Sequence, residues 1–118
     1  MKNEVVIIQT YYHVTEIANW KSIQKQGLIP MQGERAKELN EPPAVFLFPS
    51  EHDMNTALSQ WLGDWFNDKE ALIGQPVTLI LLKITLPDTF PIAQQTVPFE
   101  RLSYHPIPAN YIHFYKTE

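Results

Sequence analysis

The residues best suited to chemistry are a histidine, a phenylalanine pair and a glutamate that lie far apart in the sequence. His13 stands near the end of segment 4–14, whose β-branched and aromatic residues predict a strand. Phe46 and Phe48 belong to the apolar segment 44–48, which predicts a short strand buried on both faces. A histidine and an aromatic face on adjacent strand ends would suit a ligand that contains a ribose and a ring, such as NAD.

Glu100 is the third candidate. It lies within segment 97–104, which we interpret as a strand. Glutamate is disfavoured in strands unless it has a function or faces solvent. Composition alone favours the solvent-facing interpretation of this residue.

Two helices are expected to position these residues. The first begins at Thr15, its N-cap, and runs to about Gln26, because Gly27 stands where a helix commonly ends. The second follows Ser50 and Asp53, which resemble a capping box. Its apolar residues recur at helical spacing and are expected in the core: Met54, Ala57, Leu58, Trp61, Leu62, Trp65 and Phe66. Between the helices, the polar, proline-rich segment 30–43 predicts a long loop, and such loops are often functional.

Helices come early and strands late, without regular β-α-β alternation, so we expect an α+β fold. It would contain a split, mainly antiparallel sheet and two to three helices, with segment 77–86 as a central strand and segment 111–116 as the last one. We expect His13 and Glu100 to face one cleft. With 118 residues, the chain is expected to form one domain, 1–118.

Composition excludes several classes of function. The net charge of −4 argues against a broad nucleic-acid surface, and no apolar run approaches the length of a membrane span. The sequence has no cysteine, which excludes disulfides and thiolate chemistry and fits a cytoplasmic protein. The four histidines lack the spacing of a local metal pair, so no metal is expected. The familiar Gly-rich phosphate loops, the nucleophile elbow and the HExxH motif are absent as well.

The ordered set of motifs resembles the ADP-ribosyltransferase superfamily, which includes poly(ADP-ribose) polymerases, DNA ADP-ribosyltransferase toxins and RNA 2′-phosphotransferases. The family opens its site with a strand-end His, followed by a helix of the form xNxxxILxxGL. Its second motif is an apolar strand with a Tyr, and its third is a Glu that opens a late strand. The matching residues here are His13, Asn19, Ile23, Gly27, Leu28, Phe46, Ala57 and Glu100, with Ile107, Tyr111 and Tyr115 after the Glu. The family's Gly after the His is Val14 here, and its Tyr is Phe46.

The resemblance implies a role for each candidate residue. Glu100 would stabilise an oxocarbenium-like transition state and act as general base. His13 would hold the adenine-side ribose of NAD, and Thr15 would contact that sugar or the carboxamide. Phe46, or Phe48 by a two-residue shift, would stack on nicotinamide. Arg35 would bind the pyrophosphate, because a fork of donors suits phosphate.

Three functions remain open on the sequence, beside a domain with a purely structural role. The first is an NAD-dependent mono-ADP-ribosyltransferase that modifies a protein or nucleic-acid acceptor, with NAD as substrate and without a metal. The second is an inactive module on the same fold that binds ADP-ribose or a nucleotide; Val14 and Phe46 favour it. The third is an enzyme similar to RNA 2′-phosphotransferases, whose further Arg and His residues have no clear counterpart in this chain.

Overall fold

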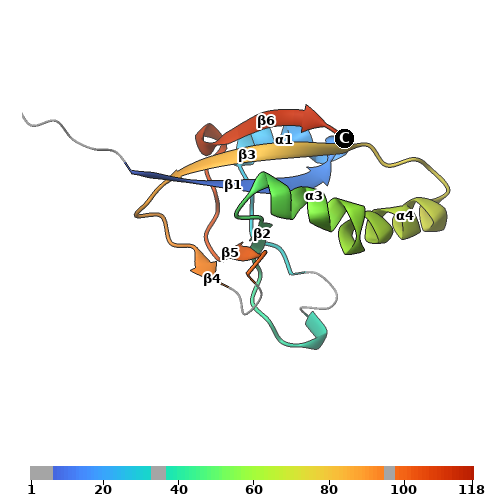
Figure 1. Ribbon diagram of the computed structural model, residues 1–118, viewed down its shortest axis with the longest axis horizontal. Helices are drawn as coiled ribbons and strands as arrows, with labels where there is room; N and C mark the ends of the chain where they lie inside the picture. The colour runs from blue at the N-terminus through green and yellow to red at the C-terminus, as the bar shows by residue number, and fades with distance from the viewer. Residues whose placement is uncertain (1–6, 33–36, 95–97) are drawn as a thin grey trace, which may run out of the picture.

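The protein is a small α+β domain, as the order of its sequence elements predicts (Figure 1). The computed structural model describes residues 7–32, 37–94 and 98–118. In these ranges the helices are α1 (Trp20–Gln26), α3 (Glu51–Ser59) and α4 (Trp61–Ile73), with 3₁₀ turns η1 (Ile17–Asn19) and η2 (Ala109–Tyr111). The strands are β1 (Ile8–Glu16), β2 (Val45–Leu47), β3 (Leu79–Pro87), β4 (Ala93–Gln94), β5 (Arg101–Ser103) and β6 (Ile112–Thr117).

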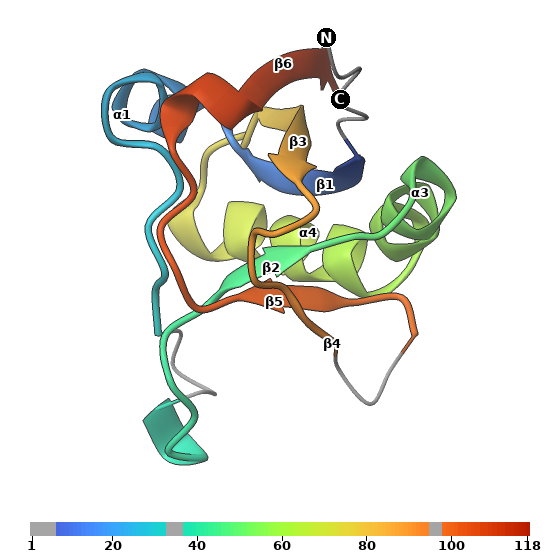
Figure 2. The same ribbon diagram turned by 90° about the vertical axis from the view of Figure 1, so that its left-hand side faces the viewer.

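The strands form two antiparallel sheets, which Figure 2 shows one above the other. The first has the order β1-β3-β6, and the second has the order β2-β5-β4. Strand β3 is therefore central in its sheet, which confirms the prediction for segment 77–86. Its residues are almost all apolar because both of its faces are covered, as the run of consecutive buried side chains shows.

A single backbone bridge links the two sheets within the described residues. Tyr12 and Phe48 exchange hydrogen bonds in both directions, with N–O distances of 2.9 and 2.8 Å. Strands β1 and β2 are paired only at this point, so the sheet is split, as expected. Backbone groups of β2 beyond the bridge must then find partners other than β1 backbone.

The core has two parts, one on each face of the β1-β3-β6 sheet. The larger part contains Ile80, Leu82 and Ile84 from β3, together with Val45 and Leu47 from β2. The smaller part lies under α3 and contains Leu81, Phe48, Met54 and Ala57. Alternate residues of β3 thus belong to different parts, because successive side chains of a strand point to opposite faces.

Strand β1 ends later than predicted: it runs from Ile8 to Glu16, whereas the sequence indicated a strand over 4–14, of which residues 4–6 lie outside the described part of the chain. Thr15 is not a helix N-cap; it pairs with Ile80, and the strand continues to Glu16. A β-branched residue favours a strand when a long partner such as β3 is available for pairing. Gly27 ends α1 as predicted, with a φ of 76°, and a Cβ at this position would collide with the Ile107 carbonyl.

The second predicted helix is divided in two, and this corrects the predicted core. The cap is confirmed, since the Asp53 amide donates to the Ser50 hydroxyl over 3.1 Å. The helix then breaks at Gln60, whose φ of −127° and ψ of −116° are not helical. The break reorients the following residues, so that Trp61 is 46% exposed and Trp65 is 56% exposed. The prediction that both tryptophans lie in the core is therefore wrong.

Two further expectations need correction. The segment 44–48 is not buried on both faces, because the Phe46 side chain is exposed. The predicted strand 97–104 is shortened to β5, since residues 98–99 form a turn. The last strand agrees with the prediction to within a residue at each end. Within the described ranges, no helix combines the length and the apolar character needed to cross a bilayer.

Candidate functional site

His13 lies where β1 and β2 diverge, and its side chain fills part of that split. Its Nδ1 atom is 2.7 Å from the carbonyl oxygen of Phe46 on β2. A carbonyl can only accept, so Nδ1 carries the proton and donates it. Beyond the bridge between Tyr12 and Phe48, no backbone amide of β1 donates to the Phe46 carbonyl. The imidazole of His13 donates to it instead. Two candidate residues that lie 33 positions apart are thereby brought into direct contact.

The surroundings of His13 keep its imidazole neutral. Burial lowers the pKa of His13 below its usual value of 6.5, and the hydrogen bond to the Phe46 carbonyl opposes this effect only in part. With the proton on Nδ1, the other ring nitrogen, Nε2, is an acceptor. A neutral Nε2 can accept a hydrogen bond from a hydroxyl group, such as that of a ribose.

Thr15 lies two residues after His13 on β1, so the two side chains share a face of the strand. Its hydroxyl oxygen accepts a hydrogen bond of 3.0 Å from the Asn19 amide. Asn19 lies in η1, directly before α1. The turn after β1 therefore orients the hydroxyl of Thr15 and connects it to the start of the first helix.

The two phenylalanines of the second motif have different environments. Phe48 is 5% exposed and packs against Met54, Ala57 and Leu81 in the core. Phe46 is 45% exposed. Of the two rings, only that of Phe46 is open to a ligand in this structure.

Phe46 lines a pocket of about 200 Å³. The remaining lining residues are mostly apolar and come from the long loop, from β5 and from the residue after it: Met31, Glu41, Pro42, Ala44, Leu102 and Tyr104. Met31 and Ala44 exchange backbone hydrogen bonds of 3.3 and 3.1 Å, which hold the two ends of the loop together. Among the described lining residues, Glu41 supplies the one carboxylate. The pocket thus offers apolar contact for a ring and an acceptor for an N–H group.

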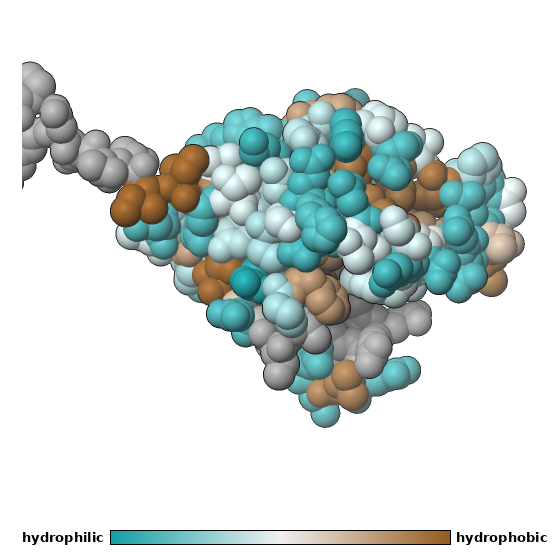
Figure 3. Space-filling model, in the orientation of Figure 1, coloured by the Kyte–Doolittle hydropathy of each residue, from teal (hydrophilic) through white to brown (hydrophobic). Residues whose placement is uncertain are grey.

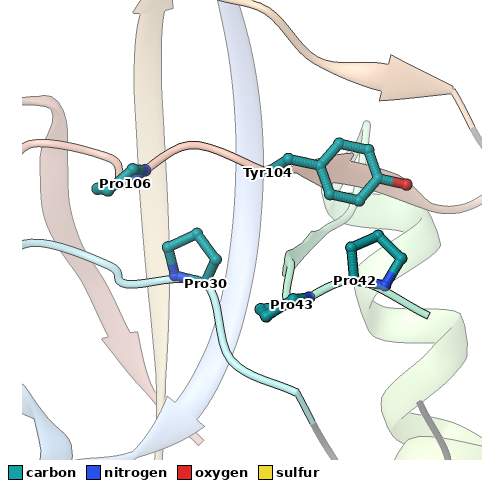
Figure 4. A pocket seen from close by; sticks show the side chains of 5 residues that line it. All are labelled: Pro30, Pro42, Pro43, Tyr104 and Pro106. Carbon is teal, nitrogen blue, oxygen red and sulfur yellow. The ribbon is translucent and has the colours of Figure 1, made fainter. Parts of the chain in front are cut away.

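A second, more open hollow of about 480 Å³ adjoins this pocket, since both are lined by Pro42 and Tyr104. In Figure 4, four proline rings and the Tyr104 ring surround it: Pro30, Pro42, Pro43 and Pro106. Proline rings present rigid apolar surface without N–H donors. The second hollow is therefore mainly apolar, whereas the pocket that Phe46 lines combines apolar and polar surface.

Glu100 lies directly before β5, whose first residue, Arg101, pairs with Leu47 of β2. Its side chain is partly buried, and this burial raises the pKa of the Glu100 carboxyl above its usual value of 4.5. A carboxylate with a raised pKa accepts a proton more readily than an ordinary one. Glu100 thus directly precedes the strand that pairs with β2, whereas His13 comes from β1 of the other sheet. That the two side chains face one cleft stays a prediction.

Arg101 was not expected from the sequence and is part of this arrangement. One of its guanidinium nitrogens donates to the carbonyls of Pro98 and Glu100, at 2.9 and 2.8 Å. These bonds fix the turn that carries Glu100. Burial raises the pKa of Tyr11 above its usual value of 10.0, and the positive charge of Arg101 opposes this effect only in part. In the sequence, the only sign of this role is that Arg101 directly follows the candidate residue Glu100.

Arg35 lies outside the described residues, so the structure gives no position for the expected pyrophosphate contact. Comparison of the chain with protein-family models, curated proteins and solved structures found no match. Among the described residues, no three His, Asp or Glu side chains form a group that could hold a metal ion. Any functional conclusion therefore depends on the arrangement around β2.

Proposed function

We propose that the protein is an NAD-dependent mono-ADP-ribosyltransferase with its site around β2. The observation that carries this proposal is the hydrogen bond between His13 and the Phe46 carbonyl, beside a pocket that the Phe46 ring lines. A neutral acceptor for a sugar hydroxyl and an exposed aromatic ring thus occur on adjacent strands. This is the combination that the resemblance to ADP-ribosyltransferases implies.

In this proposal each part of NAD has a partner. His13 Nε2 accepts from the adenine-side ribose, and Thr15 contacts the same sugar or the carboxamide. Nicotinamide stacks on Phe46, and the Glu41 carboxylate accepts from its carboxamide N–H. Arg35 remains the proposed contact of the pyrophosphate.

The reaction breaks the bond between the ribose carbon C1′ and the nicotinamide nitrogen. The bonding electron pair leaves with nicotinamide, and positive charge develops on the ribose as an oxocarbenium-like state. Glu100 stabilises that charge in its ionised form. The acceptor's nucleophilic atom then forms a bond with C1′, and its proton passes to the Glu100 carboxylate. The hydrogen bonds from Arg101 to the 98–100 turn support the position of this carboxylate.

The acceptor is a protein or a nucleic acid in this proposal. A cytoplasmic location, expected from the cysteine-free sequence, is also part of it. The apolar surface beside Phe46 favours acceptors that present a planar or apolar group next to their nucleophile.

The decisive experiment incubates the pure protein with NAD labelled in its ADP-ribose part and with a panel of protein and nucleic-acid acceptors. Nicotinamide release and transfer of label are measured together. Glu100→Gln should lower turnover by about a hundredfold or more while NAD binding is retained. Glu38→Gln, an exposed glutamate in the long loop, is the matched control and should leave turnover unchanged.

The alternative is a module on this fold that binds ADP-ribose without reaction. The specific observation in its favour is the ring of Phe46, which can stack but lacks the hydroxyl of the family's tyrosine. The side chain of Val14 carries less weight, because it packs with the core under α3 and not on the His13 face. If the parent protein binds ADP-ribose and consumes no NAD with any acceptor, this alternative replaces the enzyme.

A further inference from the structure

Helix α4 carries large apolar side chains on its exposed side. Trp61 and Trp65 lie one turn apart, and Leu72, two turns further along the same side, is 87% exposed. Phe66 is the one residue of this helix that is buried. Soluble proteins rarely expose several large apolar side chains on one side of a helix, and such patches commonly mark interaction sites.

Acidic side chains alternate with these apolar residues. Asp64 and Asp68 are exposed and lie at helical spacing between Trp61 and Leu72. The nearby cation, Lys69, forms an ion pair of 2.8 Å with Glu16 and lies 5.6 Å from the centre of the Trp65 ring. Its charge is thus already matched inside the molecule. Figure 3 shows hydrophobic and hydrophilic surface intermixed at the α4 end of the molecule.

We propose that these five residues, Trp61, Asp64, Trp65, Asp68 and Leu72, form a docking surface, here called the α4 face. Its occupant is a basic amphipathic helix of a partner protein. The apolar stripe of such a helix would cover the tryptophans, and its Lys or Arg residues would pair with the two aspartates. Tryptophan at the centre of an interface commonly contributes much of the binding energy. This inference is independent of the proposed enzymatic activity.

Charge distinguishes this occupant from others. A second copy of the chain would bring the same aspartates opposite one another, and like charges at close range oppose association. A nucleic acid would bring phosphates to a surface that has no unmatched cation among these five residues. A basic helix alone matches both the apolar and the acidic residues of the α4 face.

The size of the surface predicts a modest affinity. Trp61 and Leu72 are separated by about 16 Å along the helix axis, or about three turns. A partner helix of similar length would cover an area at the small end of specific interfaces. Dissociation constants in the micromolar range are expected for such a contact.

The test uses a fluorescein-labelled synthetic peptide of leucine and lysine arranged as an amphipathic helix, with binding to the full chain followed by anisotropy. A second peptide has the same composition with its leucines dispersed, and a third has glutamate in place of lysine. The tryptophan emission is recorded as well, because two of the three tryptophans belong to the α4 face. Only the first peptide should bind and shift this emission to the blue.

Variants locate the contact. Trp65→Ser should weaken binding at least about tenfold. The double variant Asp64→Asn, Asp68→Asn should weaken it and reduce its dependence on salt. The matched controls are Ile8→Ser, an exposed apolar residue, and Asp88→Asn, an exposed carboxylate, both outside α4. Circular dichroism confirms that each variant is folded.

Several results would overturn the proposal. One is equal binding of the dispersed or the acidic peptide, and another is unchanged binding by the Trp65 variant. A third is the absence of binding of the basic helix up to about 1 mM, where even a weak contact is detectable. A monomer–dimer equilibrium in sedimentation that Trp65→Ser abolishes would assign the α4 face to a second copy instead.

Discussion

The imidazole of His13 donates a hydrogen bond of 2.7 Å to the backbone carbonyl of Phe46, across the split between the two sheets. The bond sets the proton on Nδ1 and leaves Nε2 as an acceptor. It also connects the proposed ribose contact to the strand that carries the proposed ring contact. The protonation state of His13 is therefore linked to the relative positions of His13 and Phe46.

The first prediction concerns the protonation of His13. Its pKa is lowered in the folded protein, so the unfolded chain binds a proton at higher pH than the folded one. The stability contributed by neutral His13 should be fully present above about pH 6.5 and should decrease as the pH falls from there through the lower, folded pKa. Nitrogen NMR at neutral pH should show the Nδ1–H tautomer. His13→Gln should remove this part of the pH dependence of the melting temperature; an unchanged profile would contradict the assignment.

Truncation of Phe46, in β2, and of Phe48, directly after it, should affect stability and NAD binding differently. Phe48→Ala should cost about 3–5 kcal/mol of stability, because it leaves a cavity under α3. Phe46→Ala should cost less than about 1.5 kcal/mol but should weaken binding of NAD about three- to tenfold, since a stacking contact is lost. Thermal unfolding and calorimetric titration measure the two effects. Phe46→Tyr should retain the stacking contact.

Glu100 should be unfavourable for stability at neutral pH. Its pKa is raised by burial, so the folded state favours the protonated form, and stability is lost as the pH rises through the usual value of 4.5 to the folded pKa. Glu100→Gln should therefore raise the melting temperature slightly at neutral pH and lose this advantage in acid. The same variant should lower turnover, and turnover of the parent should rise with pH as Glu100 ionises. A drop in melting temperature at neutral pH would contradict the assigned environment.

A further prediction follows from the divided helix. Trp61→Ala should cost less than about 1.5 kcal/mol of stability, since almost half of this side chain is already in solvent. Met54→Ala should cost about 2–5 kcal/mol, because Met54 is completely buried under the sheet. Chemical denaturation of both variants tests the contrast. Equal losses would mean that Trp61 is packed in the core after all.

Features set by neighbouring residues could be predicted from the sequence. The Ser50 cap, the glycine after α1 and the apolar character of β3 all depend on local preferences or on a continuous pattern. The α+β class followed from the order of these elements. The same reasoning located the last strand to within a residue at each end.

Features set by distant contacts could not be predicted. Thr15 belongs to β1 because Ile80, far along the chain, provides a partner for it. The helix breaks at Gln60 although the apolar spacing continues without a gap, and only the packing of α3 on the sheet decides which residues that spacing buries. The role of Arg101 depends on three-dimensional contacts with the 98–100 turn. No local pattern contains this information.

The pairing of β1 has a consequence for how the chain folds. Ile8 at the start of β1 pairs with Pro87, and Glu16 pairs with Leu79, so this strand lacks its long partner β3 until residues 79–87 have been made. Before that, the bridge between Tyr12 and Phe48 is the one backbone pairing that the described residues offer it. During synthesis β1 therefore waits for β3 while helices α1, α3 and α4 are made. Pairings of such separation form slowly, on a scale of about milliseconds to seconds in isolated domains. Early termination before β3 would leave the N-terminal strand as a free edge, open to association with other chains.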